Sequence, residues 1–126
     1  MIDRDKVRRI LRDYPTLTKF GFGLECDDPF DGHDLAACLE FMSLCGPIKS
    51  PNKCSYHVKH LVEAWLHKSQ EPSGCYIGGG VPILAAMYLG FKWKKPTWGP
   101  NADIALSAKC EKWEQLPPYA GTWLVK

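Results

Sequence analysis

One nine-residue segment, VPILAAMYL at positions 81–89, is apolar on every side. Pro82 suits the first turn of a helix and Gly90 suits its end, so the segment predicts a short helix. A helix with no polar face has to be enclosed by other elements. We therefore expect the rest of the chain to pack around residues 81–89.

Three amphipathic helices are predicted before that segment. Residues 4–14 carry apolar side chains at helical spacing after Asp3, a residue type that caps helix N-termini. Residues 33–45 repeat the pattern after Asp31, which we expect to be the cap, and end at a Gly-Pro pair. Residues 55–68 form the third, with one apolar face and a polar face that includes Lys59, Glu63 and three histidines.

A small antiparallel sheet is expected after the central helix. Residues 91–94 alternate apolar and basic side chains with the period of a half-buried strand, and residues around 104–106 are its expected partner. The tail predicts a short strand at 122–125, while residues 16–30 fit either a short strand or a glycine-broken loop. The predicted fold class is α+β, about four helices with a small antiparallel sheet, in a single domain over residues 1–126.

The composition bounds the class of protein. With 126 residues, of which 45% are hydrophobic, the chain is long enough for one domain with a true core. It has no uninterrupted apolar run of the roughly 18 residues that a bilayer requires, and its N-terminus does not resemble a signal peptide. We expect a cytoplasmic protein whose six cysteines are mostly buried, reduced thiols.

Charge is distributed in blocks along the chain. Residues 1–19 carry six basic and three acidic side chains, whereas residues 20–48 carry six acidic and no Lys or Arg. Residues 49–95 carry seven Lys against two Glu. If the blocks fold onto different faces, the resulting dipolar surface can steer a charged partner. The sequence equally allows the blocks to intermix in space.

The third predicted helix offers the best spacing for metal ligands. His60, Glu63 and His67 fall on one helical stripe, and Cys54 and His57 precede them. Zinc takes three or four such ligands. The chain has neither a CxxC pair nor an HExxH motif, and a solvated polar face explains the same residues. A metal-dependent hydrolase at His60, Glu63 and His67 is therefore the weakest of three hypotheses.

Two further motifs fail as ligand sites. The acidic run 27–34 resembles a calcium loop, but Pro29 and Cys38 would occupy ligand positions that they cannot fill. The glycines at 78–80 precede a helix yet match neither nucleotide-binding pattern, so we expect them to pack closely against backbone. No cofactor and no assembled catalytic group is predicted.

The expected hairpin interleaves lysines with tryptophans. Lys92, Lys94 and Lys95 alternate with Trp93 and precede Trp98. This combination can bind a nucleic acid, with lysines on phosphates and an indole stacked on a base. A strand that buries Trp93 and leaves its lysines in solvent explains the same pattern. A winged-helix arrangement is disfavoured because the preceding helix has no side chain that reads base edges.

Three short segments resemble a pattern found in short uncharacterised proteins of bacteria and their phages. The segments are SYHVKH at 55–60, AAMYLGF at 85–91 and PNA at 100–102, matching SYxxKH…AAxxLGF…PNA. Glycines at 78–80 stand where the pattern has an asparagine-containing turn. The resemblance implies a bacterial or mobile-element setting and no known activity. It also implies one structural or binding cluster, made up of Ser55, Tyr56, Lys59, His60 and Asn101.

These observations favour a small, non-enzymatic accessory or regulatory protein that acts through a macromolecular partner, most simply another protein. Trp, Tyr and Arg side chains dominate the anchors of such interfaces. A nucleic-acid-binding protein that uses the basic hairpin is the second hypothesis. The predicted partner-binding residues are Lys59, His60, Lys92, Lys94, Lys95, Trp98 and Asn101.

Overall fold

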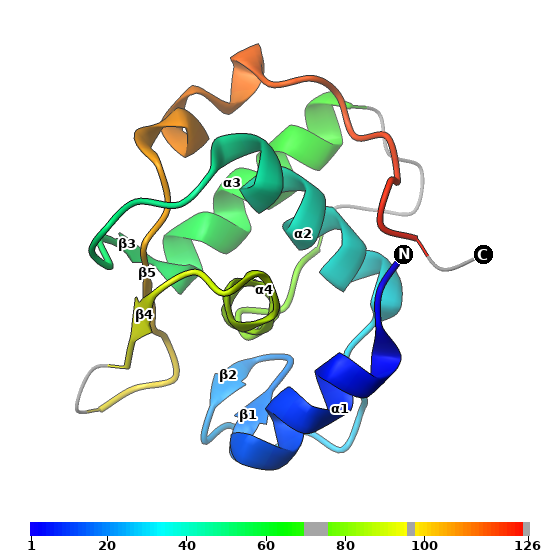
Figure 1. The fold of residues 1–126 in the computed structure, drawn as a ribbon, viewed down its shortest axis with the longest axis vertical. Helices are drawn as coiled ribbons and strands as arrows, with labels where there is room; N and C mark the ends of the chain where they lie inside the picture. Colours follow the sequence, from blue (N-terminus) through cyan, green and yellow to red (C-terminus); the bar gives the residue numbers. More distant parts are fainter. Residues whose placement is uncertain (70–75, 96–97, 125–126) are drawn as a thin grey trace.

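The computed structural model describes residues 1–69, 76–95 and 98–124, and places the apolar helix α4 (Val81–Leu89) at the centre of an α+β fold. Figure 1 shows α4 end-on, with α1 (Arg4–Asp13), α2 (Gly32–Cys45) and α3 (Ser55–Lys68) around it. Every side chain from Val81 to Ala86 is buried. The prediction of a central helix is confirmed. None of the helices in the described ranges is long and apolar enough to cross a membrane.

The helix ends follow the expected local chemistry. The Asp3 carboxylate accepts from the backbone N–H groups of Asp5 and Lys6, at 3.0 and 3.2 Å, and so caps α1. Asp31 caps α2 by accepting from the N–H groups two and three residues further on, at 2.7 and 3.3 Å. Gly90 ends α4 with φ of 78°, a left-handed conformation that glycine adopts without strain.

Two small antiparallel sheets complete the fold. Strands β1 (Leu17–Thr18) and β2 (Gly21–Phe22) form a tight hairpin. In the second sheet, β5 (Asp103–Ile104) lies between β3 (Lys53–Cys54) and β4 (Trp93–Lys94). The predicted pairing of β4 with β5 is confirmed. Strand β3 was not predicted, and it joins the start of α3 to the basic hairpin.

The C-terminal region differs from the expectation. Thr122 and Trp123 lie in a turn, so the predicted strand at 122–125 is wrong over its described part, and Val125 lies outside the described residues. The cause is a buried carboxylate: Glu40 accepts from the N–H groups of Ala120 and Thr122 at 2.7 and 2.9 Å. A fifth, unpredicted helix, the 3-10 helix η1 (Ala108–Gln115), precedes the tail.

The glycines at 78–80 pack against the β1–β2 hairpin, as expected. The Gly80 N–H donates to the Lys19 carbonyl oxygen at 2.9 Å. A Cβ atom at Gly78 would overlap the same oxygen, and one at Gly80 would overlap the carbonyl oxygen of Thr18. Backbone meets backbone here, so the sequence needs glycine at both positions.

The cysteines follow the expectation of free thiols within the described residues. Cys38, Cys45 and Cys110 are buried, Cys26 is half-buried and Cys54 is exposed, and all five are free. Burial raises the pKa of the Cys45 thiol to about 12, which keeps it protonated. The sixth cysteine, at position 75, lies outside the described residues.

Candidate functional site

The N-terminus of α3 and the basic hairpin form one structural unit. The Ser55 N–H donates to the Ala102 carbonyl oxygen at 2.7 Å, and the Ala102 N–H donates to the buried Ser55 hydroxyl at 3.0 Å. Cys54 pairs with Asp103 in the sheet. This reciprocal bonding holds the first turn of α3 beside residues 98–101. The residues grouped by the resemblance therefore lie near one another.

The hairpin surrounds a shallow hollow of about 490 Å³. Lys94, Lys95, Trp98 and Asn101 all line it, together with Cys54 at the start of α3. The Trp98 side chain is 83% exposed, which is unusual for the largest apolar side chain. Four of the seven predicted partner-binding residues thus meet at one place. The expected burial of Trp93 is met only in part, because its ring is half-buried against Phe22.

Lys59 occupies a different environment from the solvated helix face that the sequence predicts. Its side chain is only 8% exposed, and its ammonium nitrogen lies 2.9 Å from Glu63 Oε2. The same nitrogen sits 4.6 Å from the centre of the Tyr76 ring. Glu63 Oε2 also accepts from the Ile77 N–H at 2.8 Å. The segment at 76–77 therefore covers Lys59, and this lysine supports the fold beneath the surface.

The predicted metal stripe is only partly assembled. His60 Nδ1 lies 3.0 Å from Glu63 Oε1, so both oxygens of this carboxylate already have protein partners. His60 remains half-exposed and packs edge-on against Tyr56, with ring centres 4.6 Å apart. His67 lies further along α3 and is exposed. Within residues 1–69, 76–95 and 98–124, no group of three His, Cys, Asp or Glu side chains is placed to hold a metal ion.

Three more exposed aromatic side chains lie around this unit. Phe20, Tyr56 and Tyr76 are 38%, 53% and 65% exposed. Gly79 lies between Phe20 and the hairpin, because a Cβ there would be 3.3 Å from the Phe20 carbonyl oxygen and 4.0 Å from Asn101 Oδ1. Tyr56 and Tyr76 lie on either side of Lys59, whose ammonium nitrogen is 5.8 and 4.6 Å from their ring centres. We call the whole set the aromatic–lysine surface, which comprises Phe20, Tyr56, Tyr76, Lys94, Lys95, Trp98 and Asn101.

Several lysines around the aromatic–lysine surface are neutralised by carboxylates. Lys19 pairs with Asp28 at 3.2 Å, and this hydrogen bond raises the pKa of Lys19. Lys53 lies 3.3 Å from Glu111. The pKa of Glu111 is lowered chiefly by a hydrogen bond with His57 and then by Lys53. The charge blocks of the sequence therefore intermix at these points.

Two residues of interest do not line the hairpin hollow: Lys92, a predicted partner-binding residue, and Asp34, whose pKa is raised. Lys92 is exposed and lines a different hollow, beside Asp13 and Tyr14. Asp34, in the first turn of α2, has its pKa raised to about 6 by burial and, secondarily, by the neighbouring Asp31 carboxylate. Neither side chain extends the aromatic–lysine surface.

Sequence reasoning missed Phe20 and Tyr76 as surface residues. Phe20 directly precedes Gly21, and Tyr76 lies two residues before Gly78; both glycines pack closely against backbone atoms, and this is the one signal that the sequence offers. Comparisons with protein-family models, curated proteins and solved structures found no match to this chain. The functional argument therefore rests on the chemistry of the surface itself.

Proposed function

We propose that this chain is a small, non-enzymatic binding protein that acts through a protein partner at the aromatic–lysine surface. The observation that carries the proposal is the exposure of Trp98, Tyr76 and Tyr56 on a framework held by buried hydrogen bonds. Exposed Trp and Tyr side chains on a rigid framework are typical of interface anchors, because they bury a large area at little cost in conformational entropy.

The balance of charge favours a protein partner over a nucleic acid. A single-stranded nucleic acid requires a positively charged groove that follows its backbone. Lys19, Lys53 and Lys59 each face a carboxylate within 3.3 Å, which cancels much of that field. Lys94 and Lys95 make no ion pair with another described residue and lie next to Trp98, in a hollow whose lining also includes the carboxylate of Asp103. Two charges beside apolar rings suit an acidic, partly apolar patch on a protein.

The test is capture of a partner with matched variants. Wild-type protein, Trp98→Ala, Lys94→Glu and Lys109→Glu are immobilised and incubated with nuclease-treated lysate of the source organism. Lys109 is an exposed lysine of η1 that does not line the hairpin hollow, and it serves as the charge control. Loss of a central Trp anchor costs about 2 kcal/mol or more, which corresponds to at least about a thirty-fold loss of affinity.

The expected result is a discrete protein retained by wild type and by Lys109→Glu, and lost with Trp98→Ala and Lys94→Glu. Equal retention by all four proteins would overturn the proposal. A parallel fluorescence titration with single- and double-stranded DNA and RNA tests the nucleic-acid alternative. Saturable binding that weakens with salt and disappears in Lys94→Glu would show that the partner is a nucleic acid and not a protein.

A further inference from the structure

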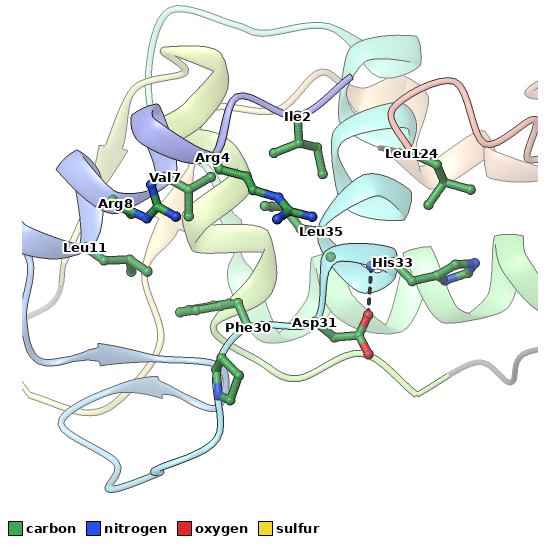
Figure 2. Close-up of a pocket in the computed structure, with 12 residues that line it drawn as sticks. Ile2, Arg4, Val7, Arg8, Leu11, Phe30, Asp31, His33, Leu35 and Leu124 are labelled. Carbon is green, nitrogen blue, oxygen red and sulfur yellow. Dashed lines mark hydrogen bonds between the residues drawn. The ribbon is translucent and has the colours of Figure 1, made fainter. Parts of the chain in front are cut away.

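A second concave site lies on another part of the molecule, between α1 and the start of α2. Its volume is about 510 Å³, within the range of about 300–1,000 Å³ typical of small-molecule sites. Figure 2 shows side chains from α1, from the segment before α2 and from the tail converging on it. Its apolar lining consists of Ile2, Val7, Leu11, Phe30, Leu35 and Leu124.

The hollow exists because α1 packs by one edge only. Helix α1 has no fully buried residue, although Val7, Ile10 and Leu11 are partly buried against the core. Val7 and Leu11, one turn apart, face the hollow, while Ile10 lines a different one beside Trp93. The apolar stripe of α1 is thus wider than its contact with α4, and the remainder stays open to a ligand.

One cation points into this apolar space. The Arg4 side chain, which lines the pocket, extends toward Leu35 in Figure 2. Its guanidinium makes no hydrogen bond or ion pair with another described residue. Arg8, on the same rim, is different because it donates to Asp5 at 2.8 Å. Arg4 therefore has all of its donors available for a ligand.

The carboxylate on the acidic side of the pocket, Asp31, already has hydrogen-bond partners in the protein. Asp31 Oδ1 accepts from the His33 and Asp34 N–H groups of α2, and the His33 ring points away from the cavity in Figure 2. A ligand anion would be repelled from Asp31 and attracted to Arg4, so the pocket has a polar end on the α1 side. Its floor, toward Phe30 and Leu35, is apolar.

We infer that this pocket binds a small amphipathic monocarboxylate, with the carboxylate on Arg4 and an aliphatic chain over Leu35 and Phe30. A planar guanidinium matches a carboxylate with two parallel hydrogen bonds. The apolar walls supply burial for the chain of the ligand. This site is independent of the aromatic–lysine surface, since the two share no residue.

The experiment is calorimetric titration of the full chain with decanoate and with decanol, both below their aggregation limits. Arg4→Gln removes the cation, and Arg9→Gln is the matched control, because Arg9 is an exposed residue of α1 that does not line the pocket. Hydrogen bonds to a charged group contribute about 1.5–3 kcal/mol, which corresponds to a loss of affinity of roughly 10- to 150-fold.

The expected result is saturable decanoate binding that weakens at least ten-fold in Arg4→Gln and is unchanged in Arg9→Gln. Decanol binds more weakly and equally to all three proteins. Methyl NMR shifts confined to the residues that line the pocket, with Leu35 and Leu11 among them, place the ligand there. Absence of saturable decanoate binding, or the same affinity in Arg4→Gln and wild type, overturns the inference.

Discussion

Replacement of Gly80 by alanine tests the packing that positions the aromatic–lysine surface. Gly80 lies against the β1–β2 hairpin, where its N–H donates to Lys19. An added Cβ would overlap the Thr18 carbonyl oxygen and lie 2.8 Å from the Gly21 nitrogen. Both obstacles are backbone atoms, so neither can rotate away as a side chain would, and the hairpin has to move.

The expected loss of stability follows from three contributions. Forcing a methyl group into packed structure costs about 1–3 kcal/mol. Displacing the hairpin weakens the Gly80–Lys19 hydrogen bond, whose net value is about 1 kcal/mol. Alanine also lowers the conformational entropy of the unfolded chain, which stabilises the folded state by about 0.4–1 kcal/mol. We expect Gly80→Ala to lower the free energy of unfolding by about 2–3 kcal/mol and the Tm by about 10 °C.

The assay is urea and thermal unfolding followed by circular dichroism, with Gly32→Ala as the matched control. Gly32 begins α2, and a Cβ there would meet no atom within 4 Å. Alanine at this helical position is expected to be neutral or stabilising by up to about 1 kcal/mol. If Gly80→Ala unfolds within about 0.5 kcal/mol of wild type, the close approach of the two backbones is refuted.

Two further perturbations probe the buried carboxylate of Glu40 and the half-buried carboxylate of Asp34. Glu40→Ala is expected to reduce the free energy of unfolding in urea by about 3 kcal/mol, because the Ala120 and Thr122 N–H groups lose their carboxylate acceptor. A variant as stable as wild type would contradict these hydrogen bonds between Glu40 and the tail. Asp34 has a folded-state pKa raised to about 6 from 3.8, so the folded state binds more protons than the unfolded state between these values. Stability contributed by this group therefore declines as pH rises from about 4 to 6. Asp34→Asn is expected to flatten that slope in urea unfolding measured at several pH values, and an unchanged slope would exclude Asp34 as its source.

Local patterns accounted for the helices and their caps. The all-apolar run at 81–89 required a central position, and Asp3 and Asp31 carry the side-chain oxygen that a helix start needs. The helix η1 was missed because its sequence lacks an apolar stripe, and Cys110 is its only buried residue. The helix is also irregular, since the backbone of Lys112 departs from helical angles.

Long-range contacts limited what the sequence could predict about the surfaces. Lys59 resembles a solvated lysine on a polar helix face, and its burial depends on Tyr76 and Ile77 covering α3. The tail was expected to end in a short strand at 122–125, yet Glu40, about eighty residues earlier, accepts hydrogen bonds from the Ala120 and Thr122 N–H groups. The pocket at Arg4 joins three separate segments, which no local pattern brings together.

The most direct test of the proposed function is site-specific photo-crosslinking in the source cells. A photoreactive phenylalanine analogue replaces Trp98 in one variant and Gln115, an exposed residue of η1, in the other. The account predicts one discrete crosslinked protein from position 98 and none from position 115. A crosslink to nucleic acid alone, or identical products from both positions, would contradict a protein partner at the aromatic–lysine surface.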